Sequence, residues 1–100
     1  MVKHVIIWTL KDQYSEEEKL KIKADIIEGL EGLSGNIPGL WDIKVYTNVL
    51  SSSNADLMLD SSFVDEAALK GYAVHPEHVA VADGKVRPYT ALRSCLDFEI

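Results

Sequence analysis

The sequence predicts an α+β fold in which a four-stranded antiparallel sheet carries helices on one of its faces. Segments rich in β-branched and aromatic residues alternate with helical patterns in the order βαββαβ. The chain has 100 residues, which is the size of one small domain, and we expect residues 1–100 to form it. A hydrophobic fraction of 47% is high for such a domain and indicates that part of its surface is covered by another molecule.

The first predicted strand spans residues 4–10, a run of β-branched and aromatic side chains. Alternate residues of a strand point to opposite faces, and here both faces are apolar. One face holds His4, Ile6, Trp8 and Leu10, and the other holds Val5 and Ile7. An antiparallel strand with a solvated face should alternate apolar with polar residues, so we expect both faces to be covered.

A helix is predicted from Ser15 to about Leu33. Ser15 and Glu18 have the spacing of a capping box, in which each side chain satisfies the other residue's backbone N–H. The expected apolar stripe consists of Leu20, Ala24, Ile27 and Leu30. A turn at residues 36–39 then leads into a second strand at 40–49, a polar loop at 51–54 and a third strand at 57–64.

The segment from Tyr72 to Val79 predicts a sharp corner between two short helices. A helix that begins near Asp65 should end by about Val74, because the residue before a proline avoids the helical region. Pro76 suits the first position of a new helix, which makes His75 its cap and His78 its third residue. Tyr72 and His78 are therefore expected to converge from the two sides of the corner.

The last predicted strand spans residues 92–98, after a helix that Gly84 should end or kink. We expect Leu92, Ser94, Leu96 and Phe98 to share one face, and Cys95 to be a buried structural thiol. The whole order is that of a ferredoxin-like domain, whose helices cover one side of the sheet. Because both faces of the first strand are apolar, we expect two copies to pack sheet against sheet as a homodimeric α/β barrel.

Charge and composition exclude several classes of partner. A net charge of −6 and a pI near 4.9 argue against nucleic acid or an anionic membrane, since both favour a basic patch. One cysteine fits a reducing compartment, and we expect the protein to be cytoplasmic. No signal-peptide pattern and no run long enough to span a bilayer are present.

The sequence resembles the Dabb family of stress-responsive dimeric α/β-barrel domains. The resemblance extends over essentially the whole chain and is most specific between residues 72 and 79. It is carried by Lys3-His4-Val5, Ser15 to Glu18, Ile37-Pro38-Gly39, Phe63, Leu69, Tyr72, His75-Pro76-Glu77-His78-Val79 and Asp97-Phe98. Asp60 within a strand and Gly84 within a helix depart from the family pattern.

This resemblance implies little about function, because most Dabb proteins have no established reaction. Some plant members are associated with stress tolerance, and one branch closes polyketide rings. In that branch, a Tyr and a His matching Tyr72 and His78 act as the acid–base pair, with a strand-one His matching His4 nearby. Ring-closing members line the cleft with aromatic residues of the first helix, which this helix lacks, so the substrate of that branch does not carry over.

Each candidate residue also has a structural interpretation. Tyr72 can be a core residue with an outward hydroxyl, and His75 can serve only as a helix cap. His78 lies near the positive end of a helix, where its imidazole should be neutral at pH 7 and able to accept a proton. We predict Tyr72 and His78 as the catalytic pair, and His4, Ile6, Trp8 and His75 as ligand-binding residues.

No cofactor and no metal are expected, because the histidines have no recognisable ligand spacing and no phosphate-binding loop is present. The leading hypothesis is a cleft that binds a small aromatic or enolisable molecule and performs cofactor-free acid–base chemistry. Whether the protein is an enzyme stays open, and the alternative is a non-catalytic, stress-associated homodimer. An open pocket that reaches Tyr72 and His78 favours the first interpretation, and Trp8 packed against His78 without a void favours the second.

Overall fold

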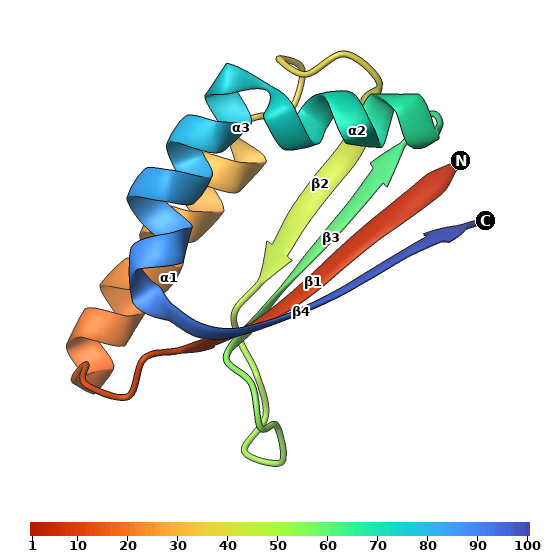
Figure 1. Ribbon diagram of the computed structural model, residues 1–100. Coiled ribbons are helices and arrows are strands. Elements are labelled where there is room, and N and C mark those ends of the chain that lie inside the picture. Colours follow the sequence, from red (N-terminus) through yellow and green to blue (C-terminus); the bar gives the residue numbers. More distant parts are fainter.

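The protein has two layers, a four-stranded antiparallel sheet and a set of helices packed on one face of it (Figure 1). The computed structural model describes all residues from 1 to 100. The elements are β1 (Val2–Leu10), α1 (Glu16–Glu31), β2 (Leu40–Tyr46), β3 (Leu57–Phe63), α2 (Glu66–Val74), α3 (Pro76–Val81) and β4 (Thr90–Glu99). This is the predicted ferredoxin-like βαββαβ fold. None of its helices combines the length and apolar character needed to cross a bilayer.

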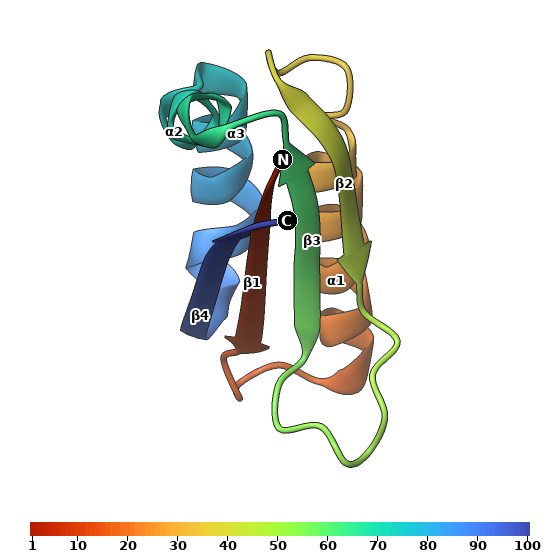
Figure 2. The same ribbon diagram turned by 90° about the vertical axis from the view of Figure 1, so that its right-hand side faces the viewer.

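The strand order in the sheet is β2-β3-β1-β4, so β1 lies at the centre and β4 at an edge (Figure 2). Every second residue of β1 is buried, because alternate side chains of a strand point to the same face and this face lies under the helices. The buried residues are Val2, His4, Ile6, Trp8 and Leu10. On the opposite face no helix covers the sheet, and Ile7 remains 42% exposed.

Helix α1 begins with the predicted capping box. The Glu18 N–H donates to Ser15 Oγ over 3.2 Å, and the Ser15 N–H donates to Glu18 Oε1 over 2.8 Å. The predicted stripe is correct for Leu30, and it is wrong for Leu20, which is 67% exposed, and for Ala24, which is also exposed. The buried face consists of Ile22, Ile26 and Leu30. Two apolar rows overlap on this helix, and contact with the sheet selects the one that the spacing alone did not favour.

The turn at residues 36–39 is confirmed, and it fixes how α2 lies against the sheet. Gly39 has a φ of +79°, a conformation that only glycine adopts without strain. A Cβ atom there would lie 2.5 Å from the Cβ of Ala68 on α2. A side chain at position 39 would therefore push α2, and with it Tyr72, away from the sheet.

The corner between α2 and α3 has the predicted geometry. Asp65 caps α2, because its Oδ1 accepts a hydrogen bond from the Ala68 N–H over 2.8 Å. Helix α2 ends at Val74. His75 is extended at φ −64° and ψ 131°, and Pro76 is the first residue of α3. Beyond α3 the prediction for Gly84 was only partly right. The chain continues through a wide π-helical turn, Ala82–Val86, and a 3₁₀ turn, Arg87–Tyr89, and does not stop at the glycine.

Edge strand β4 is exposed along nearly its whole length. The helices pack against β1, β2 and β3, and no side chain of β4 belongs to the hydrophobic core. The prediction that Cys95 is buried is therefore wrong, because this thiol is exposed. The outer face of β4 carries Leu92, Leu96 and Phe98, which are 67%, 63% and 40% exposed.

Candidate functional site

A cavity of about 570 Å³ lies between the helices and the inner face of β1 and β4. This volume is within the range of small-molecule sites. Most of the predicted site residues line it, and these are His4, Ile6, Trp8, Tyr72 and His78. Trp8 is only 5% exposed and forms part of the wall, and it leaves the space in front of His78 open.

Tyr72 and His78 meet across the corner, as predicted. Their ring centroids lie 4.0 Å apart with an angle of 34° between the planes. Tyr72 is 2% exposed, and its hydroxyl has no hydrogen-bond partner. The Nδ1 atom of His78 is also buried without a partner. Buried polar atoms without partners are costly for a folded protein, and here two of them belong to adjacent rings. Such a cost is explained where a ligand supplies the missing hydrogen bonds.

The protonation states of the pair suit acid–base chemistry. Burial has the largest effect on the pKa of His78 and lowers it, because the charged ring loses solvation. The backbone of Ala73 has the next largest effect and opposes this shift, and the positive charge of Arg87 then lowers the pKa again. Burial raises the pKa of Tyr72 well above its usual range. At neutral pH, His78 is therefore a neutral acceptor and Tyr72 a protonated donor.

His4 reaches the same cavity from the sheet. Its ring is 6.0 Å from that of Tyr72, in an edge-on arrangement. The Nδ1 atom lies 2.5 Å from Oδ1 of Asp97, which is directly opposite His4 in the pairing of β1 with β4. This short hydrogen bond holds the His4 ring in one orientation.

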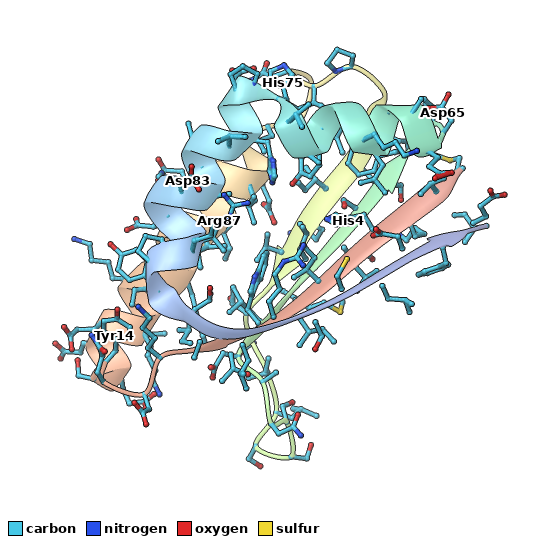
Figure 3. The ribbon with its side chains drawn as sticks, viewed as in Figure 1. His4, Tyr14, Asp65, His75, Asp83 and Arg87 are labelled. Atoms are coloured by element: carbon cyan, nitrogen blue, oxygen red, sulfur yellow. The ribbon has the colours of Figure 1, made fainter.

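His75 is the one predicted ligand-binding residue that lies outside the cavity. Its Nδ1 accepts a hydrogen bond from the Glu77 N–H at 3.1 Å, which caps α3. Figure 3 shows it on the outside of the bend between α2 and α3, whereas His4 points from the sheet toward the helices. The imidazole of His75 therefore caps α3 and does not line the cavity.

His4, Asp97 and Cys95 together offer ligand atoms that lie within 4.8 Å of one another. Two ligands of one tetrahedral zinc ion, each about 2.0 Å from it, would lie roughly 3.3 Å apart. The 2.5 Å separation between His4 and Asp97 is that of a direct hydrogen bond, so the cluster as it stands is not spaced for a metal ion. Although Cys95 is exposed, its thiol loses part of its solvation, and this loss and then the charge of Asp97 raise its pKa, which keeps it protonated and a poor nucleophile.

Many residues of the cavity wall were not predicted from the sequence, and Arg93, Asp97 and Arg87 are among them. The alternation of the last strand contained a signal for two of them. With Leu92, Leu96 and Phe98 on the outer face, Arg93 and Asp97 fall on the inner face with the helices. Arg87 follows a π-helical turn, whose wider spacing no pattern in the sequence marks.

The order of the elements along the chain and of the strands in the sheet define a ferredoxin-like domain. The sequence model of the stress-responsive A/B barrel domain, Dabb, matches residues 2–100, and the chain belongs to this family. Among curated proteins, none matches the chain.

Solved structures agree with this assignment. A dimeric protein of unknown function with a ferredoxin-like fold from Bacteroides fragilis is 32% identical, with a TM-score of 0.92 over 99% of this chain and 95% of that chain. A Dabb family protein from Mesorhizobium loti is 21% identical, with a TM-score of 0.76 over 99% and 95% of the two chains. A hydroxynitrile lyase from Passiflora edulis is 19% identical, with a TM-score of 0.74 over 99% and 92%. At such low identity, the last two show the fold alone.

Proposed function

We propose that the cavity binds a small aromatic or enolisable molecule and performs cofactor-free acid–base chemistry on it. His78 is the base, and Tyr72 donates a hydrogen bond to the reacting oxygen. The observation that carries this proposal is the pair of unpartnered polar atoms, Tyr72 Oη and His78 Nδ1, beside a largely apolar cavity. The hydroxyl of an enol or phenol can accept from the first and donate to the second, which satisfies both.

The direction of both pKa shifts supports these roles. A general base must be neutral at the working pH, and burial lowers the pKa of His78. The raised pKa of Tyr72 keeps its proton available for a developing oxyanion. His4, held by Asp97, would contact the same ligand from the sheet side. A lyase among proteins of this fold is compatible with such chemistry, although the likeness is to the fold and not to the activity.

A thermal-shift screen with phenolic and β-keto compounds tests the proposal, because a ligand stabilises the folded state by mass action whether or not it is turned over. We expect at least one compound to raise the melting temperature of the wild type and not that of His78→Ala. His75→Ala is the matched control, since it removes an imidazole from the same corner but outside the cavity. A shift that survives in His78→Ala would contradict the proposal.

We further infer that two copies of the chain pack through the uncovered faces of their sheets. Three solved structures of similar fold are described as dimeric. The uncovered face carries an apolar patch formed by Ile7, Leu92, Leu96 and Phe98, all at least 40% exposed. Such a patch on an isolated small domain favours association. We also propose a cytoplasmic location for the protein, because its single free cysteine is typical of a reducing compartment.

Sedimentation at micromolar concentration tests the dimer. Ile7→Asp places a charge within the patch and should dissociate the dimer, with loss of stability because each protomer then exposes part of its core. Leu20→Asp is the matched control, since Leu20 is an exposed apolar residue on α1. A stable wild-type monomer would contradict this interface. A dimer without a ligand site would support the non-catalytic alternative.

A further inference from the structure

Arg93 lies in the cavity wall, and its guanidinium forms no ion pair. It lies opposite Trp8 in the pairing of β1 with β4, which places it on the inner face of the edge strand. It lines the cavity, forms no ion pair and stacks on no aromatic ring. The Arg93 side chain is exposed to solvent, and because it also lines the cavity, its guanidinium is accessible to a molecule that binds there.

The other cations of the cavity wall are already paired. Lys70 lies 3.6 Å from Glu66, and Arg87 is bonded to Asp83. The imidazole of His4 is bonded to Asp97. These contacts partly offset the charges of Lys70 and Arg87, whereas no acidic side chain pairs with Arg93, so Arg93 is the cation of this wall best able to bind an anionic group.

The free charges of the wall are also separated along β4. Glu99, an acid of the wall without an ion-pair partner, lies opposite Val2, whereas Arg93 lies opposite Trp8. Six residues of strand separate them, which is roughly 20 Å. The cavity therefore has a basic end and an acidic end, with His4 and Tyr72 between them.

Arg93 lies close enough to act on the proposed site. Its positive charge opposes the rise in the pKa of Tyr72, and it also acts on the thiol of Cys95, the next inward residue of β4. Because Arg93 and Tyr72 line the same cavity, a molecule bound by Arg93 would lie in the space that the Tyr72 side chain borders. The planar guanidinium donates two parallel hydrogen bonds, a geometry that matches a carboxylate.

We propose that Arg93 binds the carboxylate of the ligand and that the substrate class is a phenolic or β-keto carboxylic acid. The carboxylate would anchor one end of the molecule, so that its enol or phenol oxygen lies between Tyr72 and His78. This assignment rests on the proposed function, and it narrows the ligand class from aromatic or enolisable molecules in general to those that carry a carboxylate.

The test compares each acid with its uncharged ester. The probes are 4-hydroxycinnamate and acetoacetate against methyl 4-hydroxycinnamate and methyl acetoacetate, with dissociation constants measured by calorimetry. We expect the wild type to bind an acid at least about tenfold more tightly than its ester, the range for charge-assisted hydrogen bonds. In Arg93→Gln this preference disappears, while the affinity for the ester is unchanged.

Arg87→Gln is the matched control, because it removes the same charge from the same cavity but from a guanidinium that is already paired. It should retain the preference for the acid, and Arg93→Lys should retain part of it. Equal binding of acid and ester by the wild type, or loss of the preference in Arg87→Gln alone, would overturn this inference and leave the proposed function standing. Failure of both acids and both esters to bind would overturn the two together.

Discussion

Replacing Tyr72 by Phe should make the free protein more stable and its ligand binding weaker. The Tyr72 hydroxyl is buried and has no partner, and such a group costs about 1–3 kcal/mol. Phenylalanine keeps the ring, which packs 5.0 Å from that of Phe63, and removes only the hydroxyl. Allowing for the small gap that is left, we expect a gain of about 1 kcal/mol in the free energy of unfolding. In a domain of this size that corresponds to a rise of roughly 4–8 °C in melting temperature.

Equilibrium unfolding in urea, followed by tryptophan fluorescence at one fixed protein concentration, measures this change. Tyr14→Phe is the control, because the Tyr14 side chain is only half-buried and its hydroxyl is not among the buried groups without a partner. It should change stability by less than about 0.5 kcal/mol. A loss of 1 kcal/mol or more in Tyr72→Phe would mean that the hydroxyl is already bonded in the free protein, which would refute the reasoning.

The remaining predictions concern the turn, the base and the sheet face. Gly39→Ala should lower the free energy of unfolding, measured in urea, by more than about 2 kcal/mol, because it adds backbone strain and a clash with α2. Gly35→Ala is the control, since it adds the same strain in open space, and it should lower the free energy of unfolding by only about 1 kcal/mol. NMR titration should place the pKa of His78 below about 6.5. Since the unfolded state then binds the proton first, stability should fall as the pH falls from 6.5 to the folded pKa, and a raised pKa would contradict this. Asp60 lies 2.6 Å from Lys3 on the uncovered face, so Asp60→Asn should cost about 3 kcal/mol if a second copy buries the pair and under about 1 kcal/mol if none does.

The sequence predicted most of the backbone and part of the candidate site. Local rules sufficed for the capping box at Ser15 and for the Pro76 corner, because both depend on residues within one helical turn. The buried face of α1 was mispredicted because two apolar rows compete, and only the position of the sheet decides between them. The bond between His4 and Asp97 joins residues 93 positions apart, so it depends on a strand register that no local pattern contains. Arg93 could be proposed as a ligand-binding residue only once the structure placed it in the cavity wall without an ion pair.

Asp60 shows how a departure from the family pattern can have a local explanation. A carboxylate within a strand is unusual on an apolar face. Here Lys3 pairs with it across the neighbouring strand and also donates to Ser62 Oγ over 3.1 Å. The hydrogen bond that Lys3 donates to the Asp60 carboxylate raises the pKa of Lys3, which keeps the ammonium group charged. The substitution is thus compensated by its neighbours and leaves the fold unchanged.

The most direct test of the ligand site is an NMR titration of protein labelled at histidine and tyrosine side chains, with 4-hydroxycinnamate as the probe. The three histidines provide an internal control, because His4 and His78 line the cavity and His75 does not. We predict saturable shifts at His78, Tyr72 and His4, with His75 unchanged. Shifts confined to His75, or no saturable shift at millimolar concentration, would contradict the claim that this cavity binds a small aromatic molecule between Tyr72 and His78.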